Sequence, residues 1–142
     1  MPSRLRLLLP LLALVLAGCA QLTREGRGDL SVHRRVFVEQ RLNDSLGVHR
    51  LLVQELRALG YDATSGWLTE LPEDAQLVVT YDARETWDFR PYLIELTAAV
   101  RPARDYHRVV ATARYFRPGV TNKRPEAMVR ELTTTLFPPA RR

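Results

Sequence analysis

Few residues of this sequence have the type and spacing that hydrolytic catalysis requires. A hydrolase needs a nucleophile, a base and an orienting group held close together. The serines beyond residue 18 are Ser31, Ser45 and Ser65, and none lies in a G-x-S-x-G turn. Ser45 stands just before a helical pattern, where a hydroxyl group caps a helix. The serines therefore indicate structural roles.

Histidines and carboxylates give no stronger signal for an active site. His33, His49 and His107 lack the H-E-x-x-H spacing that holds zinc. Glu85 and Asp88 flank a tryptophan, as paired carboxylates do in glycoside hydrolases, but a polar hairpin tip explains them better. We expect no enzymatic activity, no metal and no cofactor. In an enzyme of unrecognised type, the candidates would be His49, His107, Glu85 and Asp88.

The one thiol, Cys19, ends a hydrophobic segment near the N-terminus. Arg4 and Arg6 give a positive start, residues 5–16 are almost wholly apolar, and small residues precede the cysteine. This is the order of a secretory signal. The run is shorter than the roughly 20 apolar residues of a membrane-spanning helix. Residues 1–18 are therefore predicted to be a signal peptide.

The tetrapeptide Leu16-Ala17-Gly18-Cys19 resembles the lipobox of bacterial lipoproteins. The resemblance implies cleavage before Cys19, two thioether-linked acyl chains and an N-acyl chain such as palmitate. More than one chain holds firmly, because each buried methylene contributes about 0.8 kcal/mol. Ala20 stands where an aspartate would favour the inner membrane, which implies the outer membrane, facing the periplasm, in an organism that has one. A plain secretory signal with an incidental cysteine is the alternative.

The charges of the chain are mixed, with an excess of arginine. The whole sequence has 21 Lys and Arg against 16 Asp and Glu, and removing residues 1–18 leaves 19 against 16, near +3. Lys123 is the only lysine, which either codon bias or selection for bidentate recognition of phosphate and carboxylate would produce. Interleaved acids and an extracytoplasmic address disfavour nucleic acid. Lipopolysaccharide phosphates or cell-wall polymers suit a basic patch better.

The length beyond the signal peptide fits one domain. Residues 19–28 are polar and contain glycine, which predicts a lipidated tether that reaches at most about 30 Å. Residues 29–138 are predicted to form a single α+β domain, and residues 139–142 a tail. Such a short tether limits the partners to molecules on the same membrane or molecules that come to it.

Apolar periodicity predicts four strands and two helices. Alternation predicts strands over residues 30–40, 75–84, 92–101 and 108–116. A helical stripe runs from Val48 to Leu59, with Asn43, Asp44 or Ser45 as its cap. A second stripe ends at Leu136, with Pro125 at the first helical position. The element order is therefore β-α-β-β-β-α.

This order predicts an α+β fold, a two-layer sandwich in which two helices cover one face of a four-stranded mixed sheet. The first two strands should be parallel with a right-handed crossover, because a helix connects them. The last three should form an antiparallel meander. The opposite sheet face is expected to be solvated and able to dock a partner. Its residues are Phe37, Val78, Thr80, Leu93, Glu95, Thr97, Val110, Thr112 and Arg114.

This layout is similar to that of a broad group of small proteobacterial envelope lipoproteins of unknown function. The similarity is carried by L-x-x-L-G-Y, from Leu56 to Tyr61, and by D-A-x-L-V-V-x-Y, from Asp74 to Tyr81. The lipoprotein that partners the outer-membrane lipopolysaccharide translocon is a more distant analogue. These motifs are packing and turn signatures, so they imply a fold and a location and leave the reaction open.

A predicted hairpin tip between the second and third strands is the first candidate binding surface. Trp87, Phe89 and Arg90 lie there, and large rings beside arginines suit a partner or membrane contact. Rings folded back over the sheet are the alternative.

A basic loop after the fourth strand is the second candidate surface. Arg114, Arg117, Lys123 and Arg124 could bind an anionic ligand, or form an ordinary solvated loop. The leading interpretation of the chain is a non-enzymatic, outer-membrane-anchored accessory module that binds an envelope protein through the open sheet face, an edge strand or the hairpin tip. The alternative is a binder of lipopolysaccharide or cell-wall polymer through the arginine-rich loops.

Overall fold

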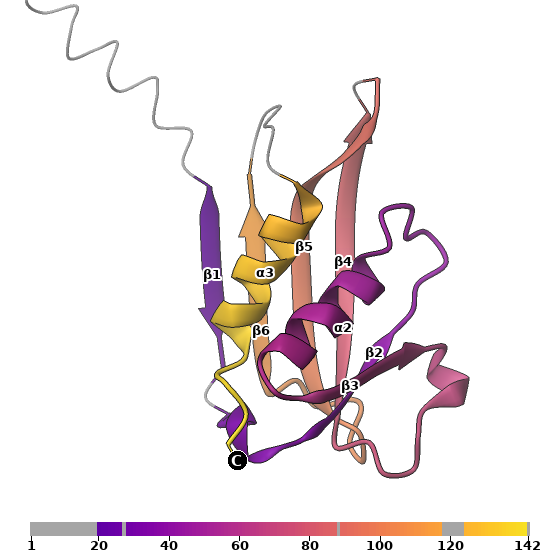
Figure 1. Ribbon diagram of the computed structural model, residues 1–142, viewed down its shortest axis with the longest axis vertical. Helices are drawn as coiled ribbons and strands as arrows, with labels where there is room; N and C mark the ends of the chain where they lie inside the picture. The colour runs from indigo at the N-terminus through magenta and orange to yellow at the C-terminus, as the bar shows by residue number, and fades with distance from the viewer. Residues whose placement is uncertain (1–19, 27, 88, 118–123, 142) are drawn as a thin grey trace, which may run out of the picture.

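The computed structural model describes residues 20–26, 28–87, 89–117 and 124–141. Within them a six-stranded sheet has the strand order β1-β6-β5-β4-β2-β3 (Figure 1). The strands are β1 Gln21–Glu25, β2 Arg35–Glu39, β3 Asp62–Gly66, β4 Leu77–Trp87, β5 Pro91–Pro102 and β6 Ala111–Phe116. The helices are α2 Val48–Ala58 and α3 Pro125–Leu136, with short 3-10 turns η1 Leu30–Val32 and η2 Leu68–Glu70.

The prediction of a four-stranded sheet was wrong, because two further strands form the edges of the sheet. β1 lies inside the range predicted as a tether and pairs antiparallel with β6. β3 lies in the connection after α2 and pairs parallel with β2. All five residues of β1 are exposed, and β3 has the polar sequence DATSG. Neither strand shows the apolar alternation that identifies a half-buried strand.

The central topology agrees with the predicted order of elements. β2 and β4 are parallel, and β4, β5 and β6 form an antiparallel meander. Both helices lie on the same face of the sheet, so the architecture is an α+β two-layer sandwich (Figure 1). The crossover through α2 leads first to the edge strand β3, which then connects to β4 through η2.

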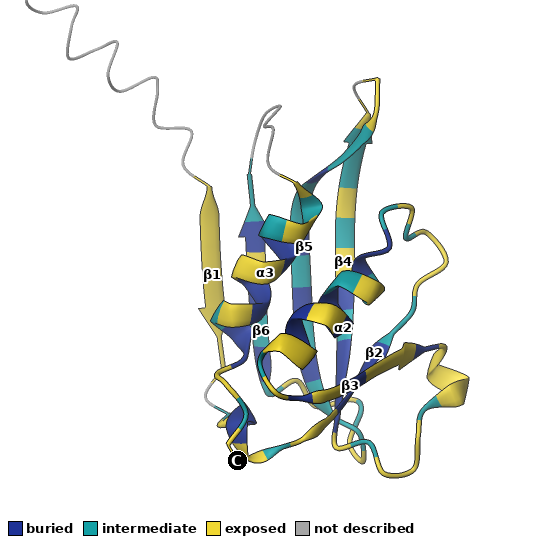
Figure 2. Ribbon diagram, viewed as in Figure 1, coloured by how far each residue is buried: buried dark blue, intermediate teal, exposed yellow. Residues whose placement is uncertain are grey.

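The hydrophobic core fills the space between the helices and the sheet. Dark-blue segments in Figure 2 mark the inward faces of α2 and α3 and the central strands. Leu52 and Leu56 of α2 and Met128 and Leu132 of α3 are buried in this core. These residues belong to the stripes that predicted the helices. The core therefore follows from the 3.6-residue period of the sequence.

An irregularity in the β4–β5 pairing moves Leu93 into the core. Arg84 pairs with Glu95 whereas Glu85 pairs with Leu93, so Ile94 has no residue opposite it in β4. Such a bulge shifts the alternation of side chains by one residue. Leu93, predicted on the solvated face, is therefore buried among the core residues. Glu85 lies on the side of the sheet that the helices cover because β4 alternates regularly through Tyr81 and Ala83, which face the core.

Part of the face opposite the helices is closed by the turn after β5. The Tyr106 hydroxyl donates a hydrogen bond to Glu39 Oε2 at 2.9 Å, and the Arg101 guanidinium lies 5.3 Å from the Tyr106 ring. This ring therefore reaches from β5 to β2. Phe37 and Val78, which were predicted to be solvated, are buried. The expectation of a wholly open face was wrong, because Phe37 and Val78 are buried on it and Tyr106 reaches across it to Glu39.

No helix among the described residues combines the length and apolar composition needed to cross a membrane.

Candidate functional site

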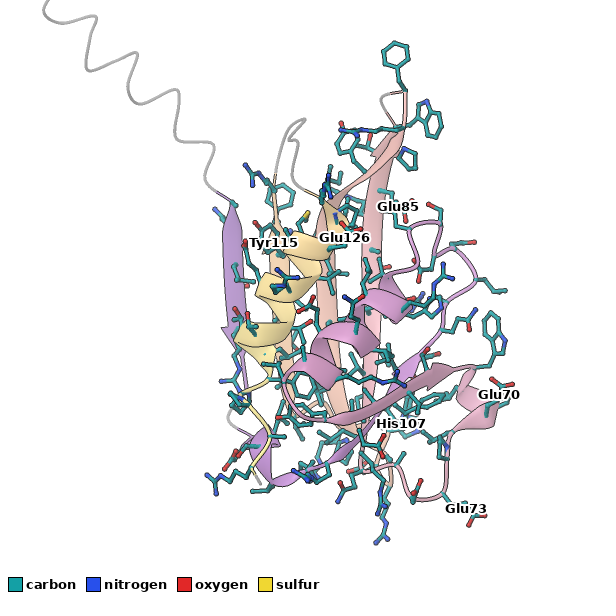
Figure 3. The ribbon with its side chains drawn as sticks, viewed as in Figure 1. Glu70, Glu73, Glu85, His107, Tyr115 and Glu126 are labelled. Atoms are coloured by element: carbon teal, nitrogen blue, oxygen red, sulfur yellow. The ribbon has the colours of Figure 1, made fainter. Side chains whose placement is uncertain are left out.

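The tip of the β4–β5 hairpin displays two aromatic side chains that the fold does not bury. Trp87 pairs with Pro91 across the two strands, and it is 72% exposed. Phe89 is 96% exposed. The side chains at the end of this hairpin stand clear of the rest of the protein (Figure 3). The alternative in which the rings cover the sheet therefore fails.

Phe89 also has a backbone conformation that bulky residues avoid. Its φ is 59°, and among the described residues other than glycine it alone has a positive φ. This left-handed conformation costs an ordinary L-residue about 1–2 kcal/mol, whereas glycine adopts it freely. Neither the turn geometry nor the hydrophobic core explains a phenylalanine here.

Register through the sheet places the hairpin tip at the same end as the start of β1. Gln21 pairs with Phe116, Phe116 with Glu95, and Glu95 with Arg84. Trp87 is three residues beyond Arg84, which is about 10 Å along a strand. Figure 1 shows the start of β1 and the hairpin tip at the same end of the protein. The chain therefore enters the fold on the side where the aromatic tip projects.

The four residues of the predicted basic loop have different surroundings. Arg114 contacts Glu95 Oε1 at 2.5 Å and lies over the Phe116 ring at 5.1 Å, on the face opposite the helices. Arg117 follows β6, and its amide donates a hydrogen bond to the carbonyl of Ile94. Arg124 is exposed immediately before α3, and Lys123 lies outside the described residues. Glu95 therefore neutralises Arg114, which makes it a poor ligand for an external anion.

A buried carboxylate, Asp44, organises the start of α2. Its side chain is 2% exposed and accepts the backbone N–H of Val48 at 2.7 Å and that of His49 at 3.0 Å. It also contacts His49 Nδ1 at 2.6 Å and accepts the Tyr81 hydroxyl at 2.7 Å. Gly47 occupies the N-cap position. Asp44, one of the three predicted capping residues, thus supplies the hydrogen bonds of a cap from three residues upstream.

The pKa values in this cluster indicate a structural network. Burial raises the pKa of Asp44, but the hydrogen bonds from His49, Val48 and Tyr81 outweigh it and lower the pKa below its ordinary 3.8. Burial, followed by the hydrogen bond to Asp44, raises the pKa of Tyr81. Asp44 therefore stays ionised and Tyr81 stays neutral near pH 7. In these states neither group is suited to exchange protons with a substrate.

Glu85, a candidate catalytic residue from the sequence, lies close to the segment that carries Asp44. It accepts a hydrogen bond from the Ser45 hydroxyl, while its second oxygen, Oε1, is buried without a hydrogen-bond partner among the described residues. His107 lies at the opposite end of the molecule (Figure 3). Asp88 lies outside the described residues. The structure therefore brings Glu85 and His49 to one region but separates both from His107.

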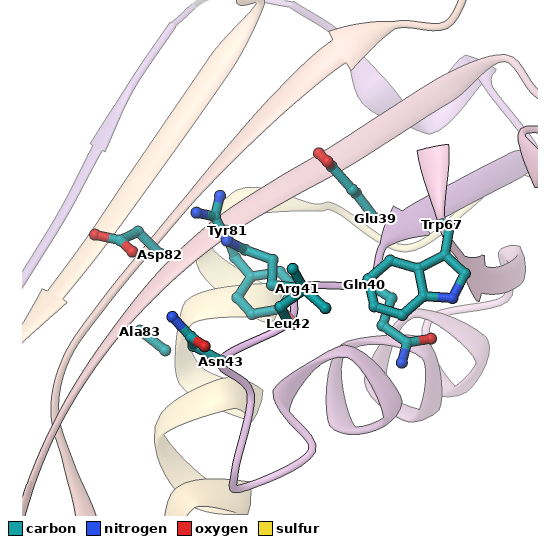
Figure 4. A pocket seen from close by; sticks show the side chains of 9 residues that line it. All are labelled: Glu39, Gln40, Arg41, Leu42, Asn43, Trp67, Tyr81, Asp82 and Ala83. Carbon is teal, nitrogen blue, oxygen red and sulfur yellow. The ribbon is translucent and has the colours of Figure 1, made fainter. Parts of the chain in front are cut away.

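An open cleft of about 570 Å³ lies where β2 ends beside β4 (Figure 4). Trp67 is 39% exposed and forms one side of it. The other lining residues are Glu39, Gln40, Arg41, Leu42, Asn43, Tyr81, Asp82 and Ala83. Glu39 and Tyr81 are already held by Tyr106 and Asp44. Across the described part of the chain, no group of three or more His, Cys, Asp or Glu residues could hold a metal ion.

The sequence matches no family model and no curated protein sequence. Its fold is similar to that of two solved structures from Paraburkholderia phytofirmans, both described as PelC dodecamers, one of them a variant with a single substitution. The variant has a TM-score of 0.61 at 17% identity, and the other structure a TM-score of 0.59 at 16%. Each comparison covers 87% of this chain and the whole of the PelC chain. At this identity the likeness establishes a shared fold.

A weaker likeness is to a minor lipoprotein from Acinetobacter baumannii. The TM-score is 0.38 at 14% identity, over 72% of this chain and 88% of the other.

The aromatic residues of the tip could be identified from the sequence, but their position relative to the N-terminus could not. That relation depends on β1, whose polar sequence lacks the apolar alternation by which a strand is predicted. The one signal for β1 is Gly26, whose φ of +104° lets the backbone approach the carbonyl of Val110. A Cβ at this position would lie 2.4 Å from that oxygen, so the glycine is needed where β1 leaves the sheet.

Proposed function

We propose that this protein is a non-enzymatic lipoprotein, anchored in the outer membrane through acylated Cys19 and facing the periplasm. In this role it is an accessory or binding module of an envelope protein assembly. The charge and apolar pattern of residues 1–18, which is typical of a signal peptide, and the tetrapeptide ending in Cys19 support the anchor. The structural roles of Asp44, Tyr81 and Glu85 support an absence of catalysis.

One observation carries this proposal: β1 is an exposed edge strand that begins two residues after Cys19. All five of its residues are exposed, and its one neighbour among the described strands is β6. An edge strand presents backbone N–H and C=O groups that can pair with a strand of another chain. Because only Ala20 separates Cys19 from β1, this edge lies beside the membrane. A partner would therefore meet the domain at the membrane surface.

A second copy of the same chain is one partner that fits this edge. The PelC structures that share the fold are described as dodecamers. The sheet here has two different edges, β1 and β3. Contacts between unlike surfaces of identical chains produce rings when the rotation closes. Self-association through the sheet edges is therefore the form of assembly that we propose first.

Site-specific crosslinking in intact cells tests this function. A photoreactive residue at Thr23, in the middle of β1, should capture a defined membrane-associated protein or a second copy of the chain. The matched control is Gln54 on the exposed side of α2. Crosslinks from Thr23 that are no different from those of Gln54 would contradict a docking role for β1. The mass of the purified acylated protein in detergent then separates self-association from a complex with another protein.

A further inference from the structure

We propose that the tip of the β4–β5 hairpin is a second membrane contact of this protein. Trp87 and Phe89 insert into the boundary between headgroups and acyl chains of the same phospholipid leaflet that holds the acyl chains of Cys19. Nearby arginines face the anionic headgroups. This inference rests on the lipid anchoring in the proposed function and adds an orientation of the domain on the membrane.

The position of the anchor carries the argument. Gln21 is the second residue after Cys19, so the Cα of Cys19 lies within about 7 Å of the start of β1. The hairpin tip projects about 10 Å beyond the level of Gln21, in the direction from which the chain enters the sheet. The anchor and the tip therefore reach similar heights, and acyl chains in a bilayer bring the tip to its surface.

The chemistry of the tip suits the membrane interface. Trp87 and Phe89 are among the most exposed large apolar side chains of the described chain, at 72% and 96%. Aromatic rings favour the headgroup region of bilayers, and tryptophan in particular is enriched there. Phe89 holds a strained backbone conformation while its ring contacts solvent, which a site for an apolar ring outside the protein would explain.

Basic residues surround the tip at this end of the protein. Arg84 and Arg90 are exposed beside the aromatic residues, and Arg124 is exposed where α3 begins. α3 begins at the same end of the protein as the hairpin tip (Figure 1). Glu95 lies 3.6 Å from Arg84, whose side chain stays 60% exposed. Basic residues beside interfacial aromatics strengthen binding to anionic lipids.

The acids at this end offset part of that positive charge. Asp88 lies between the two aromatic residues in the sequence, and Glu126 lies in the first turn of α3, near this end (Figure 3). Glu85 and Glu95 are the other acids at this end, and the five arginines there outnumber the four acids by one; these arginines are Arg84, Arg90, Arg114, Arg117 and Arg124. The tip therefore keeps a net positive charge facing the lipid. A protein partner could also contact such a tip, but the short connection from Cys19 holds the tip at the bilayer surface, which favours the lipid.

The two tryptophans of the chain provide an internal test. Acylated protein is purified from membranes as the single-tryptophan variants Trp67→Phe and Trp87→Phe. Each is reconstituted into vesicles of phosphatidylethanolamine and phosphatidylglycerol with brominated acyl chains, which quench nearby tryptophan. Ser65 of β3 and Val79 of β4 both pair with Val38 of β2, so they lie at the same level of the sheet. Trp67 follows Ser65 by two residues, whereas Trp87 follows Val79 by eight. Trp67 therefore lies about 20 Å farther from the tip than Trp87. Trp67 is thus the matched control.

We expect Trp87 to lose most of its emission and shift it to shorter wavelength, while Trp67 keeps most of its emission. Flotation with the vesicles reports on the anchor separately. Protein that floats with Trp87 quenched no more than Trp67 would overturn this inference and leave the anchoring intact; a crosslink from Trp87 to a protein would then assign the tip to that partner. Protein that does not float would overturn the anchoring and this inference together.

Discussion

Replacing Asp44 by alanine should destabilise the protein strongly, although Asp44 lies in a connecting segment. The change removes two hydrogen bonds from the first turn of α2. Loss of a capping carboxylate costs about 0.5–2 kcal/mol. It also leaves the hydroxyl of buried Tyr81 without its acceptor, at a cost of about 1–3 kcal/mol. The expected loss in the free energy of unfolding is about 3 kcal/mol.

Urea unfolding followed by circular dichroism at about pH 7 measures this loss. The matched control is Asp62→Ala, because Asp62 is an exposed aspartate on the edge strand β3. Exposed substitutions of this kind change stability by about 0.5 kcal/mol or less. A loss below about 1 kcal/mol for Asp44→Ala, or one equal to that of the control, would refute the role of Asp44 as organiser of α2.

Acid should weaken the contribution of Asp44 in a defined range. Its pKa in the folded protein lies below the ordinary value of 3.8, because hydrogen bonds to the carboxylate outweigh its burial. The ionised form therefore stabilises the fold above the unfolded pKa, and this stability is lost as pH falls through the folded pKa. The stability difference between the natural protein and Asp44→Asn should shrink as the pH falls below about 4. A difference unchanged down to pH 2 would contradict the lowered pKa.

Three further predictions follow from the backbone and the buried tyrosines. Gly26→Ala should lower the free energy of unfolding by at least about 1–2 kcal/mol, because the residue has a positive φ and the new Cβ would clash with the carbonyl of Val110. Hydrogen exchange should accelerate more in β1 than in α2. Unchanged exchange in β1 would count against this prediction. Phe89→Gly should raise the urea midpoint slightly, since about 1–2 kcal/mol of strain relief exceeds the roughly 0.5–1 kcal/mol entropy cost of glycine; a lower midpoint would assign Phe89 a packing role. Burial raises the pKa of Tyr61 to about 12 and also raises that of Tyr81. The protonated tyrosines therefore stabilise the fold fully below about pH 10, and this stabilisation is lost at higher pH. Absorbance of the folded protein at about pH 11 should show both still protonated, whereas ionisation of every tyrosine near pH 10 would contradict their burial.

The central layers of the fold could be predicted because burial leaves a periodic trace in the sequence. The stripes of α2 and α3, the meander β4–β5–β6 and the parallel relation of β2 and β4 all depend on apolar side chains that face the core. β1 and β3 could not be predicted in this way. They are edge strands held mainly by backbone pairing, and backbone hydrogen bonds are the same for every non-proline residue.

The candidate site likewise has features that a local sequence pattern predicts and features that depend on how the strands pair. Trp87, Phe89 and Arg90 were identified because large rings in a turn are visible in a sequence. Their relation to the N-terminus depends on the register of four strands, and no local pattern records it. Tyr106 is a similar case, because this turn residue reaches Glu39 across the sheet through a hydrogen bond between residues distant in the sequence. Arg114 was expected to be available, yet Glu95 from the neighbouring strand neutralises it.

The orientation proposed for the domain depends on the anchor. The start of β1 and the hairpin tip lie at the same end of the protein, and this end faces the membrane only if Cys19 is acylated. Mass spectrometry of the mature protein from its natural membrane tests this most directly. The account predicts a chain that begins at Cys19 and carries two thioether-linked acyl chains and an N-acyl chain. A mature N-terminus at another residue, or an unmodified Cys19 thiol, would contradict it.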